Sequence, residues 1–458
     1  MQGSKVDEGK PVIAIVGGGV SGALTAYHLR RLFAHASIVI VDPHPAMGLG
    51  LAYSTPSLRH LLNVPAGKIS ALPDQPDHFL NWLHANYDQN ATVDTFAPRT
   101  VFGQYIQWIV SQTPGLEHVR SSVVGCRLQG SGAELNLSDG RAVQADQVVI
   151  ATGNYAPARL RGIAEAAVQN GAYCHDAWSS GTYTALNDTD PVMLIGTGLT
   201  AVDVILRLRE LGHRGVITAV SRSGILPNRH AQYTPTAEPV IPVGTHPTCL
   251  AYLQSLRRAI RSGVEWRAAI DSLRAVTNDL WLALPLNEQR RFRRHLQRRW
   301  EVVRHRMAPP IAHSIDEELA AGTLVIQQGH LHSIEAAGSG ALVSIRGAKG
   351  VRSFETARVI NCTGPNMNYR TVDAALLKSL FAQELVKEGP LGTGFNCTPS
   401  GALIDADGAH SKVLFNVGPG RLGTLIESIA VPEIRQQAAD LAEHLHESAS
   451  QYGEAVAA

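Results

Sequence analysis

Short, mostly apolar runs recur along the chain, separated by stretches in which apolar positions return every three or four residues. Short apolar runs are typical of strands buried on both faces, and the longer spacing is typical of helices. The runs lie at 12–16, 37–41, 148–151, 192–195, 216–220, 323–327, 341–346, 357–361 and 413–417. Strands that alternate with helices in this way predict an α/β fold with parallel sheets.

A glycine-rich turn follows the first of these runs directly. The segment 17–22 reads GGGVSG and precedes a helical stretch, the apolar run 37–41 and an acid, Asp42. This succession matches the dinucleotide-binding fingerprint, in which the glycines allow a tight turn, a close backbone approach to pyrophosphate and close helix–sheet packing. The helix start then presents free N–H groups to phosphate. The residues assigned to this site are Gly17, Gly19, Ser21, Gly22 and Asp42.

Asp42 favours FAD or NAD over NADP at this first turn, because a carboxylate accepts hydrogen bonds from ribose hydroxyls and repels a 2′-phosphate. The alternative is a glycine turn that only packs the helix onto the strand.

A second copy of the fingerprint occurs at 192–201, which reads VMLIGTGLTA. Ala201 takes the place of the third glycine, which the fingerprint tolerates. The following strand ends in Ser221-Arg222-Ser223, where the acid is missing, and an Arg beside hydroxyls suits a 2′-phosphate. The second turn is therefore expected to bind NADPH, the alternative being a solvated Arg222. The residues assigned to this site are Gly196, Thr197, Gly198, Thr200, Ser221 and Arg222.

Two dinucleotide sites of different preference predict electron transfer, with NADPH as hydride donor and FAD as acceptor. Two further strands end in small residues that allow a close approach to a cofactor. They contribute Ala151, Thr152, Gly153 and Gly364 to the expected FAD site. The fold class predicted is thus α/β with two Rossmann-like dinucleotide-binding domains and a helical insertion.

The two fingerprints and the turn at 151–153 resemble the two-dinucleotide-binding flavoproteins, in particular the N-hydroxylating flavin monooxygenases and bacterial proteins of the broad FAD/NAD(P)-binding group. The segments 79–84, 99–108, 418–424 and 430–435 extend the resemblance over most of the chain. Two residues depart from the family pattern: Val101 stands where an acid is usual, and Pro419 stands where many relatives have Asp.

The resemblance implies an enzyme that uses FAD, NADPH and O2 to hydroxylate the nitrogen of a small amine or amino acid through a flavin C4a-hydroperoxide. It places Asn63 beside the flavin ring and Lys68 at a substrate carboxylate, as the catalytic candidates. It also implies FAD contacts for Asn63, Gly418 and Thr424. The alternatives are a turn cap for Asn63 and a surface position for Lys68.

Other functions remain open at this point. The alternatives are an NADPH:FAD oxidoreductase without oxygen insertion, C- or S-oxygenation, and a non-catalytic FAD-binding sensor. Carbonyl oxygenation is disfavoured because His175 and Trp178 lie too close together for the Baeyer–Villiger signature. A dithiol reductase is disfavoured because the chain has no CxxC pair. Arg229 and His230 follow the second nucleotide strand, and we expect them near the nicotinamide or its phosphates.

Composition narrows the class of protein further. A formal net charge of +1 gives no reason to expect nucleic acid, and the apolar runs are shorter than the roughly 20 residues of a membrane helix. The five cysteines are scattered, as expected for free thiols in a cytoplasmic protein, and no histidine spacing indicates a metal site. A small-molecule substrate is the expected partner, and a homo-oligomer is left open.

The order of the patterns predicts a discontinuous FAD-binding domain. Its N-terminal part covers 1–187 and its C-terminal part 326–458, with the NADPH-binding domain at 188–325 and a helical insertion at 250–308. Within the insertion, Phe292, Leu296 and Trp300 predict one amphipathic helix with a basic outer face, the alternative being an anion site. The arginines around this stripe are Arg290, Arg291, Arg293, Arg294, Arg298, Arg299, Arg304 and Arg306. A last helix is expected from about residue 424.

Overall fold

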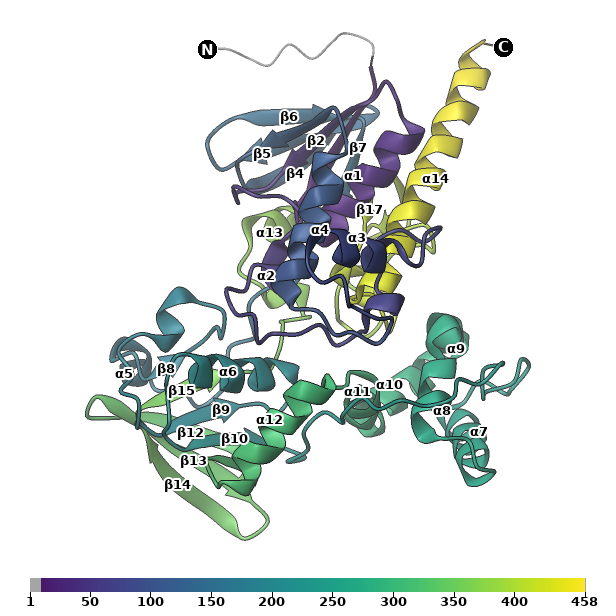
Figure 1. Ribbon diagram of the computed structural model, residues 1–458. Coiled ribbons are helices and arrows are strands. Elements are labelled where there is room, and N and C mark those ends of the chain that lie inside the picture. The colour runs from purple at the N-terminus through teal and green to yellow at the C-terminus, as the bar shows by residue number, and fades with distance from the viewer. Residues whose placement is uncertain (1–9, 458) are drawn as a thin grey trace. The chain divides into compact units, whose positions relative to one another are not determined.

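The computed structural model describes residues 10–457 (Figure 1). The chain forms two compact units. The first comprises the residues up to Thr55, Val64–Asn154 and the residues from Met367 onward. The second comprises Pro56–Asn63 and Tyr155–Asn366.

The first unit is built on a six-stranded sheet in the order β16-β17-β7-β1-β2-β3, parallel except for the pair β16/β17. On the central strand, Ile15 pairs with Ile40 on one side and Val149 on the other, and all three are buried. The strands are β1 (Val12–Val16), β2 (Ser37–Val41), β3 (Leu116–Val119), β7 (Gln147–Ile150), β16 (Ala402–Ile404) and β17 (His410–Asn416). Because β17 pairs with β7, the two ends of the chain share one sheet.

Helices cover this sheet. Two of them, α1 and α14, pack against each other (Figure 1). The helices are α1 (Val20–Leu32), α2 (Gly50–Tyr53), α3 (His78–Asn86), α4 (Arg99–Ser111), α13 (Ala375–Ala382) and α14 (Val431–Ala457), with 3-10 turns η1 (Ala66–Lys68), η4 (Tyr369–Thr371) and η5 (Pro419–Gly423). A small antiparallel sheet completes the unit, with β4 (Val123–Gln129), β5 (Gly132–Leu137) and β6 (Ala142–Ala145).

The second unit repeats the parallel architecture with five strands in the order β11-β10-β9-β15-β8. The strands are β8 (Tyr173–Cys174), β9 (Val192–Ile195), β10 (Ile217–Ser221), β11 (Leu324–Gln328) and β15 (Arg358–Asn361). An antiparallel sheet of β12 (His330–Ala337), β13 (Gly340–Gly347) and β14 (Gly350–Thr356) packs against it. Met193, Val220, Val343 and Ile345 form part of the shared core.

The remaining elements of the second unit are helical. Next to the sheets lie α5 (Glu165–Gln169), η2 (Ser180–Tyr183), α6 (Leu199–Glu210) and α12 (Pro309–Ala320). The insertion consists of α7 (Cys249–Arg261), α8 (Trp266–Ser272), η3 (Arg274–Val276), α9 (Thr277–Ala283), α10 (Leu286–His295) and α11 (Gln297–Arg304). The α/β class with two Rossmann-like units is therefore confirmed.

The bounds of the units differ from those expected from the sequence. The strands β8 and β15 pair with each other, and β15 pairs with β9, so the stretches 155–187 and 326–366 belong to the second unit. The short segment Pro56–Asn63 also belongs there. Which strand a short parallel strand pairs with depends on contacts between distant parts of the chain, so the local sequence pattern does not predict it.

Two expectations about helices were wrong. The apolar stripe 292–300 lies on two helices, because α10 ends at His295 and α11 begins at Gln297, with Leu296 (φ −115°) between them. The basic face is only partly solvated, since Arg304 and Arg306 are buried. The last helix begins at Val431 rather than near 424, because 419–423 form η5.

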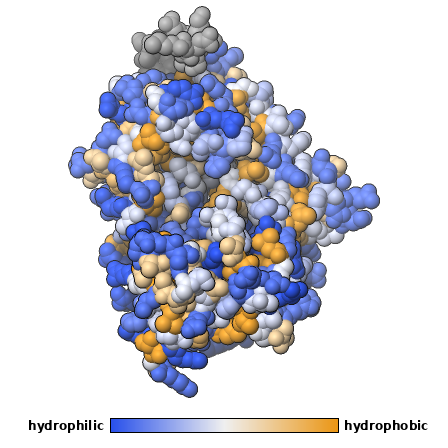
Figure 2. Space-filling view, turned by 90° about the vertical axis from the view of Figure 1, so that its left-hand side faces the viewer, coloured by the Kyte–Doolittle hydropathy of each residue, from blue (hydrophilic) through white to orange (hydrophobic). Residues whose placement is uncertain are grey.

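Surface polarity is mixed on the face shown in Figure 2, where hydrophobic residues are interspersed among hydrophilic ones. Within residues 10–457, no helix combines the length and the apolar character needed to cross a membrane.

Candidate functional site

The first glycine turn joins β1 to α1 in a conformation that two of its residues can adopt only as glycine. Gly17 has φ +107°, and a Cβ atom there would overlap with the carbonyl of Ala151. A Cβ atom at Gly22 would overlap with the carbonyl oxygen of Gly17. The turn is fixed by the Gly17 N–H, which donates to the carbonyl of Val41 at 2.9 Å. Steric limits of the fold itself therefore account for Gly17 and Gly22.

Gly19 has a different reason to be glycine. Its φ of −69° suits any residue, and a Cβ atom there would lie 3.4 Å from Gly50, an ordinary contact. Gly198 in the second turn is similar, with φ −87° and no atom within 4 Å of an added Cβ. The fold does not require glycine at either position, whereas a ligand that approaches the backbone does. Both turns fit a bound pyrophosphate on this criterion.

Asp42 lies at the edge of the first turn. Its Oδ2 accepts from the Gly18 N–H at 2.7 Å, and its Oδ1 accepts from the backbone N–H of His44 at 2.8 Å and meets its Nδ1 at 2.9 Å. The His44 side chain is 75% exposed, so a ligand can replace its hydrogen bond. A carboxylate offers about four acceptor positions, so Asp42 retains room for a ribose hydroxyl.

Residues from the C-terminal part of the chain pack against the start of α1. Gly418 has φ +86°, and a Cβ atom there would overlap with the hydroxyl of Ser21. The Gly418 N–H donates to Gln437 Oε1 at 2.9 Å, and its carbonyl accepts from Ser428 Oγ at 2.6 Å. The structure thus brings Gly418 and Ser21 together, and Pro419 opens η5. Thr424 Oγ1 accepts from the Cys397 N–H at 3.1 Å.

The other expected FAD residues divide between the units. Ala151, Thr152 and Gly153 follow β7 in the first unit, and Gly153 has φ +70° with no atom near its Cβ position. Gly364 lies in the second unit, after β15. Among the catalytic candidates, Lys68 is exposed at the end of η1 in the first unit, and Asn63 ends the short segment of the second.

The second turn repeats the geometry of the first. Gly196 has φ +127°, and a Cβ atom there would overlap with the carbonyl of Cys362, which follows β15 as Ala151 follows β7. The Gly196 N–H donates to the carbonyl of Val220 at 2.7 Å. Ala201 is fully buried in α6. Thr200, the remaining residue assigned to this turn, lies in the first turn of α6.

Hydroxyl groups connect the second turn to the loop after β10. Thr197 Oγ1 lies 2.8 Å from the carbonyl oxygen of Ile225 and 2.8 Å from Ser221 Oγ. A carbonyl can only accept, so Thr197 donates its hydrogen to Ile225, and Ser221 must donate to Thr197. Ser221 Oγ in turn accepts from the Gly224 N–H at 3.0 Å. The Ser221 hydrogen is thus engaged within the loop and is not directed to a ligand.

An arginine that the sequence did not single out reaches the same place. Arg298 of α11 donates through Nη2 to the carbonyl of Ile225 at 2.7 Å and to the carbonyl of Thr197 at 3.3 Å. The cluster of eight arginines was the signal in the sequence, but nothing in it distinguished Arg298 from its neighbours. Arg222 itself is exposed. Its carbonyl accepts from Gln328 Nε2 at 3.2 Å.

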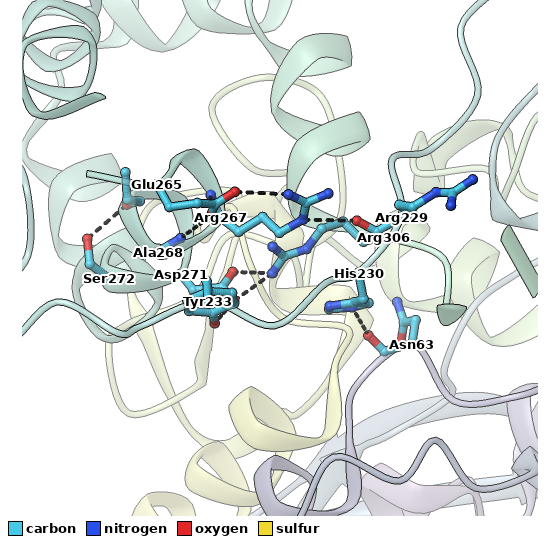
Figure 3. Close-up of polar contacts among 11 residues, drawn as sticks. Asn63, Arg229, His230, Tyr233, Glu265, Arg267, Ala268, Asp271, Ser272 and Arg306 are labelled. Carbon is cyan, nitrogen blue, oxygen red and sulfur yellow. Dashed lines mark hydrogen bonds and ion pairs between the residues drawn. The ribbon is translucent and has the colours of Figure 1, made fainter. Parts of the chain in front are cut away.

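His230 lies beside Asn63 within the second unit (Figure 3). Its Nε2 is 2.9 Å from the carbonyl oxygen of Asn63, so this nitrogen carries the proton. The backbone of His230 is held by its N–H, which donates to the carbonyl of Met307 at 2.9 Å. Arg229 forms an ion pair with Asp316. The segment after β10 is therefore anchored to the end of the helical insertion.

A buried polar cluster supports this anchor (Figure 3). Arg306 is 1% exposed and donates through Nη2 to both carboxylate oxygens of Asp271, one at 2.6 Å. Burial alone favours the neutral acid, yet hydrogen bonds from Arg306 and Tyr233 hold the pKa of Asp271 below its ordinary value. Burial and the carboxylate raise the pKa of Tyr233.

The cysteines form no disulfides, and most are buried. Burial raises the pKa of Cys126 to about 11, that of Cys249 to about 11 and that of Cys397 to about 12. Burial also raises the pKa of Cys362. Thiol exchange needs a thiolate, so these groups are poorly suited to it. Among residues 10–457, no group of three or more His, Cys, Asp or Glu residues is placed to hold a metal ion.

Comparison with known proteins identifies the nucleotide-binding part. Residues 14–155 match the family model described as FAD-NAD(P)-binding. This stretch contains the first glycine turn, Asp42 and the strand end at Ala151. A comparison with curated proteins finds no match.

Solved structures share the fold over nearly the whole chain. Ornithine N-hydroxylase of Kutzneria sp. 744, with reduced FAD, NADP+ and L-ornithine, is 14% identical with a TM-score of 0.66, over 96% of this chain and 99% of the other. Cadaverine monooxygenase of Erwinia amylovora, bound to FAD, is 13% identical with a TM-score of 0.65, over 95% and 94%. Bacillithiol disulfide reductase of Staphylococcus aureus is 13% identical with a TM-score of 0.59, over 96% and 98%. The fold is that of two-domain flavoproteins.

Proposed function

We propose that the chain is an FAD-dependent, NADPH-using monooxygenase that hydroxylates the nitrogen of a small amine or amino acid. The observation that carries the proposal is the pair of glycine turns, each with a middle glycine that only a ligand requires, in a fold shared end to end with two amine hydroxylases. The balanced reaction takes an amine, O2, NADPH and a proton to a hydroxylamine, water and NADP+.

The first turn is proposed to hold FAD. Gly19 admits the pyrophosphate, Asp42 accepts from the ribose, and Gly418 with Thr424 shapes the wall of the site opposite Ser21. The second turn is proposed to hold NADPH, with Gly198 at the pyrophosphate and Arg222 at the 2′-phosphate. When bound, the flavin supplies hydride acceptance and oxygen activation, which protein side chains lack.

The roles proposed for the chain's own residues are positional. His230 holds the backbone of Asn63 through its Nε2–H, which fixes the position of Asn63 within the second unit. The exposed ammonium group of Lys68 is proposed to bind the carboxylate of an amino-acid substrate. Neither role requires the protein to supply an acid or a nucleophile. The nucleophile is the substrate amine, which reacts as the free base.

Cysteine chemistry argues against the disulfide reductase alternative. The fold is shared with a bacillithiol disulfide reductase, but four of the five thiols are buried with a raised pKa. A thiol in such surroundings stays protonated at neutral pH and is a poor nucleophile.

The test of the proposal is the product formed from matched amines. The purified chain, supplied with FAD, NADPH and O2, is incubated with L-ornithine, L-lysine or cadaverine, and the product is measured by mass spectrometry together with NADPH consumption and peroxide. We expect a hydroxylamine in proportion to NADPH for at least one of these amines. NADPH consumption with peroxide alone for all amines contradicts the proposal in favour of a simple oxidoreductase. FAD binding without NADPH consumption contradicts it in favour of a sensor.

Lys68 provides a second test, because L-lysine and cadaverine differ only in the carboxylate. We expect Lys68→Met to raise KM for an accepted amino acid about tenfold, the worth of one exposed charge-assisted hydrogen bond, and to leave KM for a diamine unchanged. An equal change for both substrates rules out a carboxylate contact at Lys68.

A further inference from the structure

The helical insertion brings a guanidinium group to the second glycine turn from about a hundred positions further along the chain. Arg298 of α11 contacts Thr197 in the turn and Ile225 in the loop after β10. These two contacts use the hydrogens of Nη2. A guanidinium has five N–H bonds, so Nε and Nη1 keep three that donate to no acceptor in the described part of the chain.

In the described part of the chain, Glu301 is the only acid that forms an ion pair with Arg298. This pair is weak. The carboxylate of Glu301 lies 3.7 Å from Arg298 Nη1, beyond hydrogen-bond distance, and both side chains are more than one-third exposed. One of its oxygens already accepts from Gln297 Nε2 at 2.9 Å. Exposed pairs of this kind add little to stability. The charge of Arg298 therefore remains available to an anion at the turn.

The hydroxyl network strengthens the case for a cation at this place. Ser221 was expected to meet the 2′-phosphate, but its hydrogen is donated to Thr197. Ser221 therefore offers no hydrogen to a nucleotide phosphate, whereas Arg298 presents N–H bonds beside Thr197 and Ile225. Arginine suits this task because its planar fork donates to two phosphate oxygens at once.

We propose that Arg298 binds a phosphate group of the dinucleotide at the second turn, so that the helical insertion takes part in coenzyme binding. The inference rests on the proposed function for the identity of the coenzyme. The group that Arg298 would bind is a phosphate of the dinucleotide, either the 2′-phosphate or the pyrophosphate.

The test is equilibrium binding of NADP+ and NAD+, measured without amine or turnover at low ionic strength, where exposed charges are least screened. We expect Arg298→Gln to raise the Kd of NADP+ about tenfold, with the thermal stability and FAD content of the wild type. Arg298→Lys keeps the charge and should bind with an intermediate Kd. Glu301→Gln removes the competing acid and should lower the Kd. Arg299→Gln, on the exposed neighbour in the same helix, is the matched control and should leave it unchanged.

The two coenzymes locate the contact. A larger Kd for NADP+ alone assigns Arg298 to the 2′-phosphate, and an equal rise for NAD+ assigns it to the pyrophosphate. An unchanged Kd in Arg298→Gln, an equal rise in Arg299→Gln, or no advantage of Arg298→Lys over Arg298→Gln overturns the inference while leaving the hydroxylation proposal intact. A wild-type chain that binds neither coenzyme overturns both, and failure to form a hydroxylamine bears only on the proposed function.

Discussion

At the scale of single residues, the glycines of each turn fall into two physical classes. Gly17, Gly22 and Gly196 are fixed by positive φ or by carbonyl groups that an added Cβ would overlap. Gly19 and Gly198 have ordinary φ values and space for a Cβ atom. The first class serves the fold, and the second class is explained only by a ligand at the backbone.

Substitution of these glycines should separate folding from binding. We expect Gly22→Ala to lower the thermal stability of the chain even without FAD, because the new methyl group overlaps with the carbonyl of Gly17. Gly19→Ala should keep the stability of the FAD-free chain and lose most of its FAD. Thermal melting and the flavin absorbance after purification measure the two effects. Equal loss of stability in both variants would refute the distinction.

Arg222 is the residue on which the preference for NADPH depends. Its side chain is exposed at the end of β10, where a ribose-binding acid would otherwise stand. Removal of its charge should weaken binding of a 2′-phosphate and leave the rest of the coenzyme unaffected. We expect Arg222→Ala to raise the Kd of NADP+ about tenfold more than that of NAD+, measured by equilibrium titration. Similar changes for both coenzymes would remove the reason to prefer NADPH.

At the scale of elements, a buried ion pair joins α8 of the helical insertion to the segment that follows α11. Asp271 comes from α8, whereas Arg306 follows α11 beside Met307. The Met307 N–H donates to the carbonyl of Asn228 at 2.8 Å, in the segment that leads to His230. The pair thus links the insertion to the residue that holds Asn63.

Loss of the Asp271 charge should destabilise the second unit. Asp271→Asn leaves the Arg306 guanidinium buried and unpaired, which costs about 3 kcal/mol in unfolding free energy. Asp188→Asn, in an exposed pair with Arg214, is the control and should cost less than about 1 kcal/mol. Denaturant unfolding followed by Trp fluorescence measures both. A cost for Asp271→Asn no larger than that of the control would contradict this role.

The same pair predicts a pH dependence. The pKa of Asp271 is lower in the folded chain than in the unfolded one, where it is about 3.9. Its stabilising effect is therefore complete above pH 3.9 and is lost as the pH falls from there through the folded pKa. We expect the stability gap between wild type and Asp271→Asn to stay constant from pH 7 to about 5 and to narrow below about 4. A gap that widens in acid would be inconsistent with the depressed pKa.

At the scale of the whole molecule, each of the two units has its own parallel sheet and its own glycine turn. A ligand stabilises only the unit that binds it, and a chain with two cores need not unfold in one step. After removal of FAD, we expect calorimetry to show one transition that rises with FAD and another that rises with NADP+. Each shift should correspond to about 2.7 kcal/mol at a ligand concentration of 100 times Kd. A single transition raised by both ligands would contradict independent unfolding of the two units.

Local sequence patterns were enough to predict most strands of the two parallel sheets, the two glycine turns and the Rossmann-like class, whereas the short edge strands β3, β8 and β16 were not predicted. These features are local: a turn that needs glycine, an apolar run and a helical period each lie within about a dozen residues, and backbone geometry at that range follows from the residues themselves. The same locality applies to the positive φ values of Gly17 and Gly196 and to Gly22, where an added Cβ would overlap with the carbonyl of Gly17.

Contacts between segments far apart in the sequence became visible only in the folded chain. The pairing of β15 with β8 places both strands in the second unit, which the sequence did not predict. The burial of Arg306 against Asp271 shows that the basic stretch is not wholly a solvated face. Arg298 and Thr197 come together across the insertion, and no periodicity encodes a contact at that separation. Such contacts depend on the net balance of packing, desolvation and loop closure over the whole chain, so only the folded molecule specifies them.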